Sequence, residues 1–168
     1  MDHAQEHQAH SGLYRLMPGH QGPVDNGSAL AIVRWMVGCV FLAEGIQKFL
    51  FADALGVGRF MKIGIPAPEV MAPFVGVVEI VCGILLLLGL CTRLATIPLI
   101  IDMLVAIAST KIPFLITKGF WPAVHEARTD WSMILGCLAL LLAGGGRLAL
   151  DGILQRRAEA RRRPGTRT

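Results

Sequence analysis

Four long apolar blocks dominate this sequence and restrict it to folds that can keep them away from water. The hydrocarbon core of a bilayer is about 30 Å thick, so a helix needs roughly 20 apolar residues to cross it. Each block approaches that length. Charged residues make up only 17% of the chain, against roughly 25% in soluble domains. The sequence therefore predicts a small membrane protein that crosses the bilayer several times, not a water-soluble enzyme.

The predicted fold is all-α: a bundle of four transmembrane helices within a membrane domain that covers residues 29–153. The spans are placed at about 29–51, 73–90, 94–110 and 131–150. Helices are expected because a lipid-embedded segment must satisfy its own backbone hydrogen bonds. Pro98 is expected to kink the third span, and the glycines at 144–146 favour the end of the last helix.

The two ends of the chain are polar and fix the expected orientation. Residues 1–28 lack the apolar stretch of a signal peptide and are expected to form a flexible tail. Residues 154–168 form a basic tail with six arginines against the single acid Glu159. By the positive-inside rule that tail is cytoplasmic, and four spans place the N-terminus on the same side. We therefore expect a multi-pass protein of a bacterial inner (plasma) membrane.

Two segments, 52–72 and 111–130, are then expected to face the opposite side as loops. The first is apolar but interrupted by glycines and prolines, and the second mixes aromatic residues with Lys111 and Lys118. Aromatic side chains beside lysines are typical of the headgroup level. The sequence predicts that both loops lie at the membrane interface.

Five charged side chains fall inside the predicted spans: Arg34, Glu44, Lys48, Glu79 and Asp102. Charges in a bilayer are costly, so these residues must face the interior of the bundle. Counting residues from the span ends predicts an outer cluster of Lys48, Glu79 and Glu44 and an inner pair of Arg34 with Asp102. Two cations face three carboxyl groups, so one acid lacks a cation and is a candidate to bind a proton.

Two interpretations of these charges stay open. They form either a proton or ligand site or ion pairs that only fix the register of the helices. Small residues share helix faces with them and predict close helix packing. The glycines assigned to packing are Gly38, Gly45, Gly76, Gly83 and Gly136.

Several stretches of the sequence resemble the DoxX family of small four-helix membrane proteins. They are the first-span pattern Arg34, Gly38, Gly45 and Lys48; the triplet Gly64-Ile65-Pro66; Val78-Glu79-Ile80 followed by the apolar run to Leu90 and by Thr92-Arg93; and the glycine-rich close at 144–151. Ala149 departs from the serine usual in that closing motif. The resemblance covers residues from about Ala29 to Ile153.

The resemblance implies an inner-membrane protein whose relatives are subunits of a thiosulfate:quinone oxidoreductase or members of membrane redox complexes. A quinone is thus the one cofactor that it suggests. The sequence has no visible cofactor motif of its own: no span contains a histidine to ligate haem, and the four cysteines, Cys39, Cys82, Cys91 and Cys137, show no C-x-x-C spacing. No metal site is predicted, because His3, His7 and His10 are better explained as part of a polar tail.

The leading hypothesis is a noncatalytic or quinone-interacting subunit of a membrane redox system in which Glu79 or Glu44 handles a proton. A small-solute transporter and an assembly scaffold remain as alternatives. The expected partners are the lipid bilayer, anionic lipids at the arginine-rich tail, subunits of a membrane oxidoreductase and a second copy of the chain. No nucleic-acid partner is expected.

Overall fold

A computed structural model describes residues 26–146 and 149–152 of the chain, and every regular element within these ranges is a helix. The long helices are α2 (Asn26–Leu50), α4 (Pro68–Leu88), α5 (Thr92–Ala106) and α7 (Phe120–Ala143). The shorter ones are α3 (Val57–Lys62), the π-helical turn η2 (Ile107–Lys111) and α6 (Ile112–Lys118). The predicted all-α fold is confirmed.

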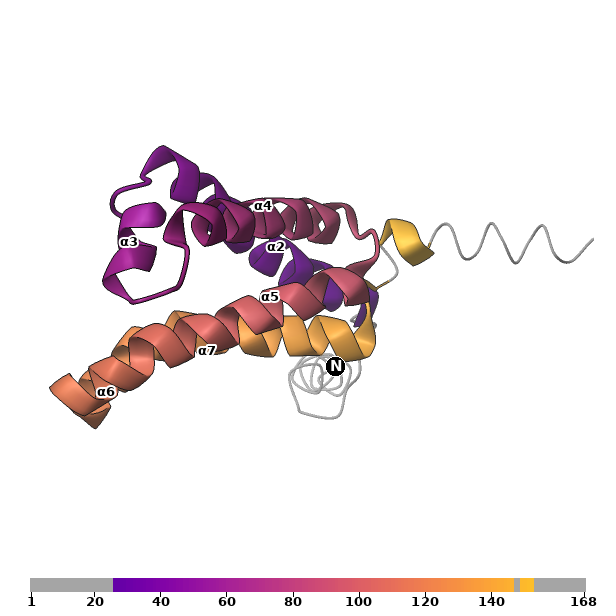
Figure 1. Cartoon of the computed structure of the whole chain (residues 1–168). Helices are drawn as coiled ribbons and strands as arrows, with labels where there is room; N and C mark the ends of the chain where they lie inside the picture. Colours follow the sequence, from indigo (N-terminus) through magenta and orange to yellow (C-terminus); the bar gives the residue numbers. More distant parts are fainter. Residues whose placement is uncertain (1–25, 147–148, 153–168) are drawn as a thin grey trace, which may run out of the picture.

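The long helices pack as two pairs. Helix α2 lies along α4, and the rod formed by α5, η2 and α6 lies along α7 (Figure 1). The two pairs come together at the end that carries the turn between α4 and α5, and they separate toward α3 and α6 (Figure 1). We call these two ends the closed end and the open end of the bundle.

Glycines bring α2 and α4 into direct backbone contact. A Cβ on Gly45 would lie 2.7 Å from the carbonyl oxygen of Gly76, and a Cβ on Gly83 would lie 3.0 Å from that of Gly38. Gly136 of α7 faces Val37 of α2, where a Cβ would come within 2.6 Å of Val37 Cγ2. All five glycines assigned to packing therefore lie at helix contacts where a larger side chain has no room.

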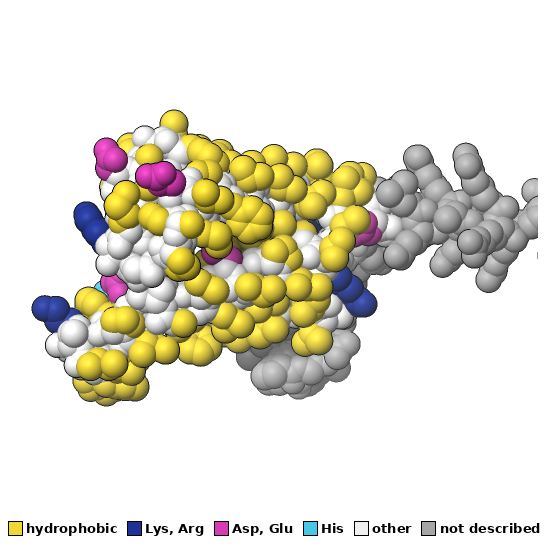
Figure 2. Space-filling view, viewed as in Figure 1, with side chains coloured by type: hydrophobic (Ala, Val, Ile, Leu, Met, Phe, Trp, Pro, Cys, Tyr) yellow, Lys and Arg dark blue, Asp and Glu magenta, His cyan; other side chains and the backbone are white. Residues whose placement is uncertain are grey.

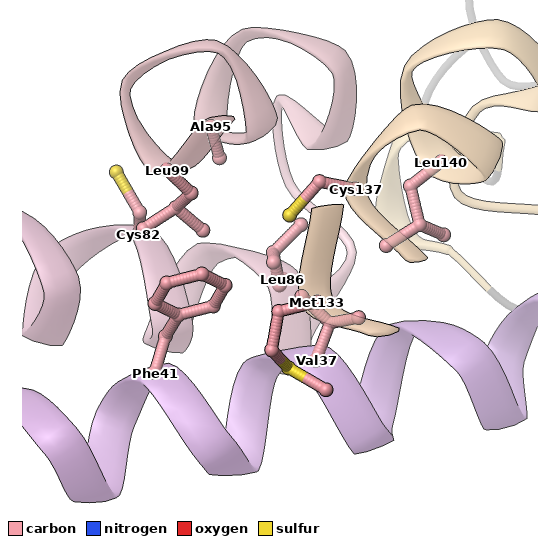
Figure 3. Close-up of a cluster of buried hydrophobic side chains, with 9 residues drawn as sticks. All are labelled: Val37, Phe41, Cys82, Leu86, Ala95, Leu99, Met133, Cys137 and Leu140. Atoms are coloured by element: carbon pink, nitrogen blue, oxygen red, sulfur yellow. The ribbon is translucent and has the colours of Figure 1, made fainter. Parts of the chain in front are cut away.

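The closed half of the bundle is filled by an apolar core to which all four long helices contribute (Figure 3). Its members are Val37 and Phe41 from α2, Cys82 and Leu86 from α4, Ala95 and Leu99 from α5, and Met133, Cys137 and Leu140 from α7. Val37, Leu86, Leu99, Cys137 and Leu140 have no exposed surface. This half of the bundle is therefore sealed.

The outer surface is that of a membrane protein. Hydrophobic side chains cover the visible face of the helices, and most charged side chains lie at its two ends (Figure 2). Within the part of the chain that the structure describes, three helical stretches are long and apolar enough to cross a bilayer: Gly27–Leu50, Pro68–Leu88 and Thr92–Lys118. Helix α7 carries Glu126, Arg128 and Asp130 in its first half, so a fourth crossing stays a prediction, as does the side on which the termini lie.

The helices differ in extent from two predicted spans and one predicted loop. The second helix begins at Pro68, not at residue 73, and the last one runs from Phe120 to Ala143, not over 131–150. Segment 111–130 is helical except at Gly119, which separates α6 from α7. Charged residues of this predicted interfacial loop pair across the helical hairpin: Lys111 Nζ lies 3.2 Å from Glu126 Oε1 and 3.4 Å from Asp130 Oδ2.

The close contact of α2 with α4 generates a first prediction. Gly45→Val should destabilise the protein by about 1–3 kcal/mol, because the added methyl groups must push apart two backbones that cannot yield. Ala43→Val is the matched control, since Ala43 is exposed on the same helix. Thermal unfolding in detergent micelles measures both variants, and equal melting temperatures for the two would contradict the packing account.

Candidate functional site

An ion pair between Lys48 of α2 and Glu79 of α4 lies inside the bundle. Lys48 Nζ donates to both carboxylate oxygens of Glu79, at 2.6 and 2.8 Å. The Glu79 side chain is only 1% exposed and that of Lys48 is 13% exposed. Gly45 and Gly76 lie one turn from the two partners and let their helices approach. The predicted meeting of Lys48 with Glu79 is what the structure shows.

Asp102 of α5 completes the buried cluster. Its carboxyl group faces that of Glu79 closely enough for the two to share a hydrogen bond when one of them carries a proton. Its Oδ2 atom is buried and has no hydrogen-bond partner among the described residues. We refer to Lys48, Glu79 and Asp102 as the buried triad.

The predicted inner pair of Arg34 with Asp102 is wrong, and the geometry of the α4–α5 hairpin explains why. Glu79 lies ten residues before Gly89, where α4 ends, and Asp102 lies ten residues after Thr92, where α5 begins. At 1.5 Å per residue both are about 15 Å from the turn. The antiparallel hairpin therefore places the two acids at the same depth.

Arg34 instead joins the C-terminal segment to the closed end. Its guanidinium Nη1 donates to the carbonyl oxygen of Gly145 at 2.8 Å, and the residue is 2% exposed. Beside it, Asp151 accepts hydrogen bonds from the backbone N–H groups of Cys91 and Thr92 at 2.9 and 3.1 Å. Asp151 thereby caps the start of α5 from a distant part of the chain. These contacts give Arg34 a structural role.

The buried triad lines a cavity of about 340 Å³ that extends toward the open end. Helix α2 contributes Phe41 and Glu44 beside Lys48, and the α3 region contributes Leu55, Arg59, Phe60, Ile63 and Ile65. Glu44 lines this cavity but is exposed and forms no ion pair with Lys48 among the described residues, so the structure joins only two members of the predicted outer cluster. The space-filling view shows an acidic side chain within a hollow of the apolar face (Figure 2).

A second group of charges, which the sequence analysis missed, lies on the same cavity near the open end. Lys111 of η2 pairs with Glu126 and Asp130 of α7, and we call these three residues the rim network. Gly119 is the sequence feature from which this network could have been predicted. If that glycine reverses the chain, Lys111 and Glu126 lie almost equally far from the reversal, eight and seven residues away.

Other candidate groups do not form a site within the described ranges. No set of three His, Cys, Asp or Glu side chains there is placed to hold a metal ion. His125 contacts Arg128 and is exposed, and all four cysteines are free thiols. His3, His7 and His10 lie outside the described residues.

This fold and this polar cavity define an integral membrane protein built of apolar helices around a buried cluster of charges. Its sequence matches the profile of the DoxX family over residues 29–112, which include most of α2, all of α4 and α5, and the whole buried triad. The chain belongs to the DoxX family. Helix α7 and the acids of the rim network lie beyond the matched segment.

Three relatives are similar over most of their length. An uncharacterized membrane protein of Mycobacterium tuberculosis is 55% identical over 134 residues, which are 76% of this chain and 82% of the relative. A Bacillus subtilis protein named "Putative oxidoreductase CatD" is 28% identical, over 71% and 82% of the two chains. An uncharacterized Haemophilus influenzae protein is 33% identical, over 73% and 87%. No solved structure matches significantly.

The buried ion pair generates a second prediction. Lys48→Met leaves the Glu79 carboxylate buried without its cation and should cost about 3–5 kcal/mol of stability. Adding Glu79→Met to that variant should recover most of the loss, because two apolar side chains replace the two charges. Denaturant unfolding in micelles measures this cycle, with Lys62→Met, an exposed lysine of α3, as the control.

The single variant Glu79→Met completes the cycle. If the double variant loses as much stability as Lys48→Met and Glu79→Met lose together, the two side chains do not act as a pair, and the assignment of the ion pair fails.

Proposed function

We propose that this chain is a quinone-binding subunit of a membrane redox system in a bacterial plasma membrane, and that the ring of the quinone binds in the cavity beside the buried triad. One observation carries the proposal. A lysine and two acids line a cavity that also has an apolar wall, inside a membrane domain.

The residues present fit a quinone ring in size and chemistry. The cavity of about 340 Å³ falls in the range of about 300–1,000 Å³ typical of small-molecule sites. An ammonium group has three N–H donors, and Glu79 takes two of those of Lys48. The third is left to donate to a ring carbonyl. Phe60, Ile63 and Ile65 supply an apolar wall against which a ring can pack.

When bound, the quinone would exchange two electrons and two protons between its oxidised and reduced forms, with the electrons passing to or from a redox centre on a partner subunit. The chain's own residues would bind the quinone and supply protons to it. Lys48 orients a carbonyl oxygen, and the facing carboxyl groups of Glu79 and Asp102 hold a proton next to it. The sealed core below the triad keeps water away from the closed side of the ring.

The comparisons support the redox part of this proposal. One relative bears a name that includes the word oxidoreductase, and the family profile covers all three residues of the triad. No cofactor motif is visible in the sequence, which is why the electron-transfer centre is assigned to a partner.

The proposal predicts that filling the cavity weakens quinone binding. Ala106→Trp places an indole ring into the cavity, since Ala106 lines it and is half-buried. Its affinity for a short-chain benzoquinone should fall at least about tenfold, which corresponds to about 1.4 kcal/mol. Ala108→Trp is the matched control, because Ala108 lies two residues away, is exposed and does not line the cavity.

Calorimetric titration of the purified protein in lipid nanodiscs measures the affinity of both variants. Asp102→Asn should weaken binding without disturbing the Lys48–Glu79 pair, whereas Glu69→Gln, an exposed acid outside the cavity, should have no effect. The proposal fails if the unmodified protein binds no quinone, or if Ala106→Trp and Ala108→Trp bind equally well.

A further inference from the structure

The cavity has two chemically different walls. The wall formed by the α3 region and the start of α4 is apolar except for Arg59 and consists of Leu55, Phe60, Ile63, Ile65, Met71 and Val75. The wall formed by α5, η2 and α7 is mixed: beside Met103, Val105, Ala106 and Met133 it carries seven polar residues, Asp102, Ser109, Thr110, Lys111, Glu126, Thr129 and Asp130. A quinone ring on the first wall would therefore leave a polar surface beside it.

Two buried carboxylate oxygens on the second wall accept no hydrogen bond from the described residues: Asp102 Oδ2 and Asp130 Oδ2. Asp130 Oδ2 has the Lys111 ammonium group 3.4 Å away as its ion-pair partner. The Ser109 and Thr110 hydroxyl groups donate to backbone carbonyl groups of their own helix, which leaves their oxygen atoms able to accept. Buried polar atoms without protein partners are usually satisfied by water, and a volume of about 340 Å³ holds on the order of ten molecules.

The described residues differ at the two ends of this wall. At the open end the rim network lines the cavity, and its Glu126 side chain is 55% exposed. Toward the closed end, Val37, Leu86, Leu99 and Leu140 fill the space between the four helices with no exposed surface (Figure 3). Within the described residues, this packing favours access of water from the open end and opposes it from the closed end.

We propose that the cavity is a water-filled vestibule, open on one side of the membrane only, that carries protons between the rim network and Asp102. Asp130 is the member of the rim network that relays protons to Asp102: it pairs with Lys111, and its charge acts on Asp102 within the cavity. The role of this vestibule in supplying protons to a quinone rests on the proposed function. The access of water to the vestibule can be measured without a quinone.

The proposal is tested by the reaction of single cysteines with a charged methanethiosulfonate reagent that does not cross membranes. The four native cysteines are first replaced by alanine, and the protein is reconstituted into sealed vesicles. A cysteine is then placed at each position of two adjacent pairs. In each pair one position faces the cavity and the other faces the lipid at about the same depth in the membrane. Met103 and Ser109 line the cavity, whereas their neighbours Leu104 and Ala108 are exposed and do not.

Cysteines at 103 and 109 should react at least about tenfold faster than those at 104 and 108, because the reactive thiolate forms only where water can solvate its charge. They should also react only from the side on which a cysteine at Lys118, at the end of α6, reacts. Native Cys91, retained alone, marks the opposite side, since it is exposed at the closed end.

Equal rates within the pairs, or reaction of position 103 from the side of Cys91, would overturn the vestibule. Size-exclusion chromatography identifies variants that do not fold. For these, the milder variant Met103→Ser is used instead, and water-to-protein magnetisation transfer in NMR measures whether water reaches position 103. If the protein binds quinone but fails this test, the proposed function stands and the proposal of a water-filled vestibule is wrong.

Discussion

The Lys48–Glu79 ion pair is the interaction on which the arrangement of this bundle depends. Charged groups inside a membrane domain are stable only when they are paired and hydrogen-bonded, so α2 and α4 must meet where these two side chains meet. Gly45 and Gly76 allow this by removing the side chains that would hold the helices apart. The pair in turn fixes the depth at which the α4–α5 hairpin presents Asp102, and this position gives the cavity its acidic inner end.

The two ends of the bundle have different roles. At the closed end, Arg34 and Asp151 bind backbone groups around the α4–α5 turn and the C-terminal segment, and an apolar core lies next to these contacts. Toward the open end the helix pairs separate, and the space between them is lined by charged and hydroxyl side chains. A charge at the closed end thus stabilises the fold, whereas the charges of the cavity face a volume in which a ligand and water have room. This asymmetry is the physical basis for the proposed function.

The sequence predicted the fold class and the buried charges well, but it predicted their pairing only in part. Lys48 and Glu79 were brought together correctly, because both depths were counted from the same end of well-defined spans. Asp102 was assigned to Arg34 because its depth was judged from a predicted midplane. Counting from the turn at Gly89 would have matched it to Glu79. The rim network was missed because charges at 111–130 suggested a loop, whereas pairing between helices makes the same charges compatible with a helical hairpin. Long-range contacts such as that of Arg34 with Gly145 leave no local signal in the sequence.

The central claim is that a quinone ring binds between the helix pairs beside the buried triad. Photoaffinity labelling with an azido-quinone, followed by mass spectrometric mapping of the modified peptides, tests it most directly. We expect label on cavity residues of α2, the α3 region, α5, η2 and α7, within 41–48, 60–65, 102–110 and 129–133, and we expect unlabelled quinone to compete for it. Label spread over the exposed apolar faces, for example at Ile101 or Leu142, without competition would contradict the account.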